Sequence, residues 1–165
     1  MRALDLDAEI LSGTSAAGFE LGMDVAEIDE IVGKGTVLHR SPNVAELHAN
    51  SGVLFVRGSL NEIRSVFFGD DKVRLCFNAQ GRLFCIFMFE GYRGAYRQKL
   101  CIGSPLAEAN AEHQLLFDDG DEMSYIDDGK GEIVPGIAFS GTSCALEADP
   151  EQLISGFCVH DWSQQ

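Results

Sequence analysis

Residues 62–89 read EIRSVFFGDDKVRLCFNAQGRLFCIFMF, and this stretch decides the fold class. Three short runs, 62–68, 72–77 and 82–89, carry strand-like hydrophobic patterns, and turn-forming residues separate them. Strands that follow one another through short turns of this kind pair in antiparallel order. We therefore predict an antiparallel meander. The third run is apolar on both faces, so we expect it to be a central strand.

Two segments on either side of this meander carry the signals that begin a helix. In residues 24–32 apolar side chains recur with helical spacing, and Asp24 and Glu27 are placed as a capping box. In the second segment Ser104 stands at an N-cap position and Pro105 at the first helical position. We expect this second helix to continue toward residues 115–117.

The two helical segments also resemble each other. Aligning Gly22 with Gly103 matches Val25 with Leu106 at the same offset of 81 positions (103 minus 22), about half of the chain. This spacing indicates an internal duplication with halves 17–98 and 99–162. Strand-like runs at 123–126, 133–139 and 154–160 make the second half another helix followed by strands. We predict one α+β domain over residues 1–165, with an antiparallel sheet, helices packed on one face and two tandem repeats.

The charge balance is strongly acidic, with 26 acidic against 12 basic residues and a formal net charge of −14. A negative field of this size disfavours nucleic-acid binding and attracts a basic protein partner, although acidity can also serve solubility alone. No apolar run approaches the roughly 18 to 20 residues that span a bilayer, and the first residues lack the apolar stretch of a signal peptide. We therefore expect a cytoplasmic protein with no membrane partner.

Residues that could carry chemistry are few. The histidines lack ligand spacing, so we expect no metal site and no cofactor. Cys158 and His160 share a strand face, but side chains two apart on a strand point alongside each other, so we expect no catalytic site. A small enzyme that uses these two residues, or Cys85 with an unidentified base, stays an alternative. The cysteines form no C-x-x-C pair and are interpreted as reduced core residues: Cys76, Cys85, Cys101, Cys144 and Cys158.

Two regions are candidates for contact with a partner. The first is residues 117–129, where six acids surround Tyr125, an aromatic residue of a type favoured at protein interfaces. A calcium loop fails the EF-hand register there, and solvated acidic loops are the plainer alternative. The second is the locally basic segment 91–99 with Tyr92 and Tyr96, which could equally tie the two halves together. The acidic candidates are Asp118, Asp119, Asp121, Glu122, Asp127 and Asp128.

The repeated strand, glycine and helix pattern at 19–28 and 100–108 resembles the duplicated helix-and-sheet unit of β-lactamase inhibitory protein. The small lipoprotein of the outer-membrane assembly machine shares this unit. The chain shows neither a signal peptide nor a lipid-attachment cysteine, which argues against both of those proteins.

The run 81–86, followed by 91–94 and 102–104, is similar to bacterial immunity proteins of type VI secretion and other polymorphic-toxin systems. This resemblance covers roughly residues 17–160, and it implies a non-enzymatic protein that binds and neutralises a cognate toxin in the cytoplasm. The families diverge too far to transfer binding residues. If the toxin is a nuclease, acidic loops at 118–128 could imitate nucleic-acid phosphates. An effector-binding chaperone or adaptor is the alternative function.

Overall fold

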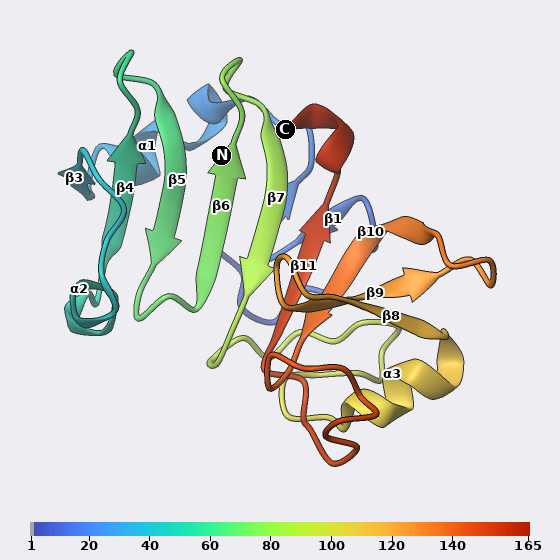
Figure 1. Ribbon diagram of the computed structural model, residues 1–165. Coiled ribbons are helices and arrows are strands. Elements are labelled where there is room, and N and C mark those ends of the chain that lie inside the picture. The colour runs from blue at the N-terminus through green and yellow to red at the C-terminus, as the bar shows by residue number, and fades with distance from the viewer. Residues whose placement is uncertain (1) are drawn as a thin grey trace.

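The computed structural model describes residues 2–165, which are organised around a nine-stranded sheet (Figure 1). The strand order is β3-β4-β5-β6-β7-β11-β10-β9-β8. The sheet is mixed, because β3 and β4 are parallel while all other neighbours are antiparallel, so the expectation of a purely antiparallel sheet is wrong at this edge. The strands are β3 (Thr36–Leu38), β4 (Val53–Arg57), β5 (Ile63–Phe68), β6 (Val73–Phe77), β7 (Leu83–Met88), β8 (Leu115–Asp118), β9 (Met123–Asp127), β10 (Ile133–Ser140) and β11 (Gly156–His160).

Two four-stranded meanders make up most of the sheet. Strands β4 to β7 follow one another in space as in sequence, and strands β8 to β11 do the same. The last strands of the two meanders, β7 and β11, pair antiparallel, with Ile86 opposite Val159 and Met88 opposite Phe157. The predicted meander is confirmed, and β7 lies in the middle of the strand order, as its two apolar faces indicated.

The helices are shorter than predicted. The first begins with the expected capping box of Asp24 and Glu27, but it divides into the 3₁₀ helix η1 (Val25–Ile28) and the single turn α1 (Asp29–Val32). A short helix α2 (Val44–Ala49), with its own capping box, was not predicted.

The second predicted helix is α3 (Leu106–Glu112), and it needs two corrections. The Ser104 hydroxyl does not cap it but accepts the Cys101 N–H at 3.0 Å. Residues 115–117 do not continue it but belong to strand β8, which pairs with β9, and the Asn110 side chain accepts the Leu115 N–H at 3.0 Å just after the helix ends.

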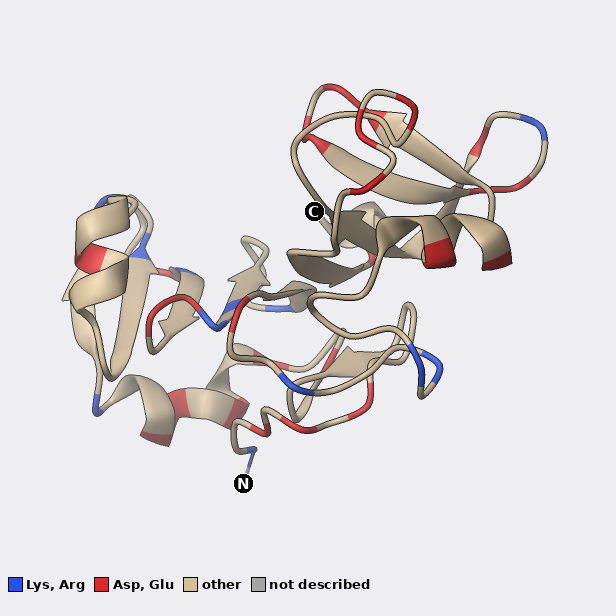
Figure 2. Cartoon of the chain, turned by 90° about the horizontal axis from the view of Figure 1, so that it is seen from below, with Lys and Arg blue, Asp and Glu red and all other residues tan. Residues whose placement is uncertain are grey.

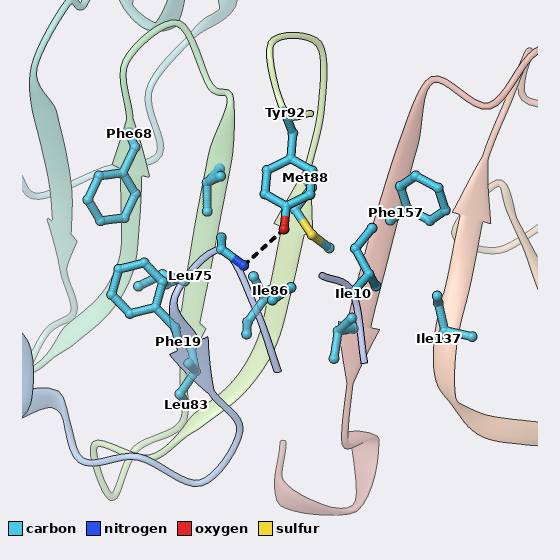
Figure 3. Packing of buried hydrophobic residues seen from close by; sticks show 14 of the residues in the cluster. Ile10, Phe19, Phe68, Leu75, Leu83, Ile86, Met88, Tyr92, Ile137 and Phe157 are labelled. Atoms are coloured by element: carbon cyan, nitrogen blue, oxygen red, sulfur yellow. Dashed lines mark hydrogen bonds between the residues drawn. The ribbon is translucent and has the colours of Figure 1, made fainter. Parts of the chain in front are cut away.

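The main core lies on one face of the sheet and is covered mostly by irregular chain rather than by helices. Ile10 and Phe19, which belongs to the small hairpin of β1 (Ser15–Ala16) and β2 (Phe19–Glu20), pack against the sheet there (Figure 3). The Tyr92 hydroxyl holds this layer together, accepting the Ala17 N–H at 3.2 Å and donating to the Ala8 carbonyl at 2.5 Å. Helices η1, α1 and α3 bury side chains in this core, but α2 buries none, so the predicted helical layer is only partial.

Both helical segments are attached to the sheet by the same pattern of hydrogen bonds. In each segment, two N–H groups take part: that of a glycine with positive φ and that of the residue three positions later. The first segment donates to carbonyls at or just before the start of β7, and the second donates to carbonyls just before β11. Such a glycine turns the chain where a side chain would be strained. The bonds run from Gly22 to Leu83 (2.7 Å), Val25 to Gly81 (2.8 Å), Gly103 to Ile154 (2.8 Å) and Leu106 to Gln152 (3.0 Å).

Candidate functional site

The face of the sheet opposite the main core, here called the open face, is the candidate site. Among residues 2–165, no helix crosses the front of β5 and β6, and the short helix η2 (Trp162–Gln164) packs against the start of β7. Helix α2 and the β8–β9 hairpin flank this face on either side (Figures 1 and 2). Paired residues in neighbouring strands point to the same side of a sheet, so the register defines the row that crosses this face. The row contains Thr36, Leu54, Phe67, Arg74, Phe87, Cys158, Ala138, Tyr125 and Leu116.

Arg74 and three phenylalanines occupy the middle of the open face. The Arg74 guanidinium carbon lies 4.9 Å from the Phe67 ring centroid, 5.5 Å from that of Phe87 and 5.4 Å from that of Phe89. Asp71 fixes the guanidinium from one side, with an Nη2 to Oδ2 distance of 2.6 Å. Arg74, Phe87 and Phe89 are half-buried, whereas Phe67 is buried beneath them. Arginine and aromatic side chains in this partly exposed arrangement are typical of the residues that dominate binding energy at protein interfaces.

Three thiols form a second feature of the open face, on β6, β7 and β11. The Cys85 Sγ lies 3.2 Å from the Cys158 Sγ, and Cys76 is paired with Cys85 in register. Burial raises the pKa of the Cys85 thiol, and the adjacent Cys85 thiol together with burial raises that of Cys76. A raised pKa keeps a thiol protonated at neutral pH, which makes it a poor nucleophile. All five cysteines are free thiols.

A layer of aromatic rings continues the open face onto β11 and β9. The His160 ring stacks on Trp162 of the 3₁₀ helix η2 (Trp162–Gln164), with centroids 4.5 Å apart and planes at 16°. Tyr125 packs against the His160 ring in an edge-to-face arrangement, with ring centroids 5.6 Å apart, and the Tyr125 hydroxyl donates to the Asp121 carboxylate. His160 is 1% exposed, and neither of its ring nitrogens has a hydrogen-bond partner among residues 2–165. Burial lowers its pKa to about 4, so the imidazole is neutral at physiological pH.

A hollow of about 360 Å³ opens beside this aromatic layer. It combines two carboxylates with two aromatic side chains, and it is lined by Asp118, Asp121, Tyr125, Ile133, Trp162 and Gln165. A second hollow, of about 450 Å³, lies at the end of β6 and includes Ser65, Cys76 and Phe84. Gln165 lines both hollows, so they adjoin each other at the C-terminal end of the described chain.

The structure divides the predicted acidic region into two separate loops. Asp118, Asp119, Asp121 and Glu122 lie in the β8–β9 hairpin, whereas Asp127 and Asp128 lie at the other end of β9 (Figure 2). The five residues of β9 separate them by roughly 17 Å. Four of these carboxylates, including those of Asp118 and Asp128, accept N–H groups of their own turns: Gly120 donates to Asp118 and Lys130 donates to Asp128. No group of three or more His, Cys, Asp or Glu side chains within residues 2–165 is arranged to hold a metal ion.

The three tyrosines predicted as contacts are buried in the fold. Tyr125 is 3% exposed, with its hydroxyl bound to Asp121, so it is part of the wall of the hollow and not a protruding anchor. Tyr92 is buried in the main core, and Tyr96 packs there against Phe139 with ring centroids 5.9 Å apart. Neither of these last two side chains is accessible to a partner, and both connect the irregular layer to the sheet.

Sequence reasoning missed the residues that distinguish the open face. The alternation in 72–77 places Arg74 on the face opposite Val73 and Leu75, but only the register shows that Phe87 lies beside it. Trp162 follows β11 by two residues, and no local pattern connects it with Tyr125, which is 37 positions earlier (162 minus 125). The signal for such contacts is the pairing of strands that are distant in sequence.

No protein-family model, curated protein or solved structure matches this chain. In the described part of the chain, the helices are all too short or too polar to cross a bilayer.

Proposed function

We propose that this protein is an immunity protein that uses its open face to bind and neutralise a cognate bacterial toxin in the cytoplasm. The observation that carries the proposal is the half-buried cluster of Arg74, Phe87 and Phe89 in the middle of an uncovered sheet face. A partly solvated guanidinium over aromatic rings offers a partner apolar surface and fixed hydrogen-bond donors in one place. Such a surface suits a protein partner better than a small metabolite.

The charge of the chain supports a basic partner. A formal net charge of −14 steers a basic protein toward the surface and accelerates its encounter. Figure 2 shows acidic residues on the loops that border the open face on the β8–β9 side, where Asp118 and Asp121 line the first hollow. A nuclease, whose own cleft is basic, would fit this field, with the acidic loops in the place of nucleic-acid phosphates.

We also propose that the chain arose by duplication of a helix followed by a four-stranded meander. The matching glycine-anchored hydrogen bonds at Gly22 and Gly103 support this, as does the sequential order of β4 to β7 and of β8 to β11. The proposal also agrees with the resemblance to the duplicated unit of β-lactamase inhibitory protein. Joining two such units through β7 and β11 produces one continuous face that is wide enough for a protein.

The open face offers little support for the alternative of a cysteine enzyme. Catalysis by a thiol needs a thiolate close to a base. Here the pKa of Cys85 is raised, and His160 makes no hydrogen bond to a thiol within the described residues. An effector chaperone would use the same kind of surface, so inhibition must be tested directly.

The test is to co-purify the tagged protein with its partner from native cell extract and to compare two arginine variants. Arg74→Ala removes the centre of the open face, and we expect it to weaken binding roughly 30-fold, as loss of about 2 kcal/mol at a hot spot would. Arg93→Ala is the matched control, because Arg93 is exposed and pairs with Asp7 at 2.7 Å in the layer that covers the other face. The urea unfolding midpoints of both variants establish that each is folded.

The outcome is read from the partner's activity and from cell survival. An immunity protein restores growth of cells that already contain the toxin, and Arg74→Ala loses this protection while Arg93→Ala keeps it. Binding without protection would favour the chaperone. Equal effects of the two variants would contradict the assignment of the open face.

A further inference from the structure

We infer that the hollow between the β8–β9 hairpin and η2 is a binding site for a guanidinium or ammonium group. Within this inference, which rests on the proposed function, the cation is the side chain of an arginine or lysine on the toxin. The hollow combines Asp118 and Asp121 with Tyr125 and Trp162, which is the chemistry that recognises an organic cation.

The two carboxylates lack a cationic partner in the described part of the chain. Among residues 2–165, no lysine or arginine nitrogen lies within 4.0 Å of Asp118 or Asp121. Asp118 Oδ1 accepts the Gly120 N–H at 2.7 Å, and Asp121 accepts the Met123 N–H and the Tyr125 hydroxyl. A carboxylate has about four acceptor positions, so each keeps capacity for a donor that enters the hollow.

The aromatic wall is held rigidly in place. Trp162 is stacked on the buried His160 ring, and the Asp161 carboxylate caps the helix η2 by accepting the Ser163 N–H at 3.1 Å. The His160 nitrogens have no partner within residues 2–165, and the ring is neutral, so it adds no competing positive charge beneath the hollow. The site is thus a fixed aromatic surface with negative charge at its rim, which needs little reorganisation to hold a planar cation.

The size of the hollow agrees with this occupant. At about 360 Å³ it lies at the low end of the range for ligand pockets, roughly 300 to 1,000 Å³. It is open to solvent on one side, so a side chain projecting from a protein surface can enter it without any rearrangement of this chain. Its position on the open face places the cation beside the rest of the proposed interface.

The experiment uses arginine amide as the probe and the indole N–H resonance of Trp162 as the reporter. Trp162 is the one tryptophan in the sequence, so its indole signal in a ¹⁵N-correlated NMR spectrum is unambiguous. We expect a saturable shift of that signal as arginine amide is added. With the α-amino groups of both probes acetylated, citrulline amide has nearly the same shape as arginine amide but no charge, and it is expected to bind at least roughly tenfold more weakly.

Two matched double variants separate a local site from the general field. Asp118→Asn with Asp121→Asn removes the charge from the hollow and keeps oxygens that can accept the same turn hydrogen bonds. Asp127→Asn with Asp128→Asn removes the same charge from a similar turn at the far end of β9. We expect the first pair to abolish saturation and the second to leave it within about twofold of the native protein.

The inference would be overturned by no shift at millimolar arginine amide, by equal binding of citrulline amide, or by equal effects of the two double variants. Each of these results leaves the proposed function to be judged separately, since co-purification and protection depend on Arg74 and need no cation in the hollow. Conversely, if arginine amide binds saturably but the protein captures no toxin, the cation site stands and the proposed toxin partner is refuted.

Discussion

Replacement of His160 by phenylalanine should flatten the dependence of stability on pH. The imidazole is buried with both nitrogens unpartnered among the described residues, and its pKa is about 4 in the folded state against 6.5 as the ordinary value. Above pH 6.5 the ring is neutral in both states. As the pH falls from 6.5 toward 4 only the unfolded chain gains the proton, so the native protein loses stability through this window.

The magnitude follows from the two pKa values. With 6.5 unfolded and about 4 folded, linkage gives a loss of about 2 kcal/mol by pH 5. The charged and titratable groups around the ring are Asp121, Asp161 and Tyr125. The substitution leaves them in place, so their own contributions to the pH dependence of stability cancel when the variant is compared with the native protein.

The assay is urea unfolding of the native protein, His160→Phe and His160→Gln at pH 7.5, 6.5, 5.5 and 5.0. Phenylalanine keeps the stack on Trp162 and removes the titration, so the variant should lose less stability than the native protein between pH 7.5 and 5.0. Glutamine also removes the titration but leaves buried polar atoms, so it should flatten the profile at lower overall stability. Identical pH profiles for the native protein and His160→Phe would refute the argument that His160 is buried and neutral.

Further predictions concern other parts of the fold. Tyr92→Phe should lower the free energy of unfolding by about 1 to 3 kcal/mol in urea denaturation, because it removes the hydroxyl and leaves the Ala17 N–H and the Ala8 carbonyl without this partner; an unchanged free energy would show that water takes the place of the hydroxyl. Gly22→Ala and Gly103→Ala should each lower the free energy of unfolding by about 1 to 2 kcal/mol in the same assay. An added Cβ meets no atom within 4 Å at either glycine, so only the φ values of +83° and +91° oppose the substitution. Losses that differ by more than about 1 kcal/mol would count against the duplication. Iodoacetamide at pH 7.5 should label Cys85 far more slowly in the native protein than in urea, as mass spectrometry of peptides can show; rapid labelling of the native thiol would support an enzyme instead.

The central meander could be predicted because its signals are local. Alternation at Val73, Leu75 and Phe77 and a doubly apolar third run specify strands without knowledge of their neighbours. The capping box at Asp24 is local for the same reason. The prediction of helix toward residues 115–117 is wrong because their apolar residues continue a helical pattern, and only pairing with β9 makes them part of a strand.

The candidate site could not be predicted, because it depends on which strands pair and on where each residue lies along its strand. The acids at 118–122 and 127–128 are near neighbours in the chain, but the strand between them places them at opposite ends of β9. Trp162 and Tyr125, in contrast, are far apart in the chain and line one hollow because β9, β10 and β11 are adjacent. Aromatic residues were expected to be surface anchors from their type, whereas the burial of Tyr92 and Tyr96 is decided by the irregular layer above the sheet.

The two halves of the chain supply different chemistry to the same face. The first meander carries the Arg74 cluster, and the second carries the acidic hollow beside Tyr125. Along the row of paired residues that crosses the open face, Arg74 and Tyr125 are four strand spacings apart, which is roughly 19 Å. A protein interface that buries about 800 Å² on each partner is wide enough to cover both. At this separation the two features share no partner atoms, so their contributions to binding should add, and a toxin that uses the whole face would respond to both.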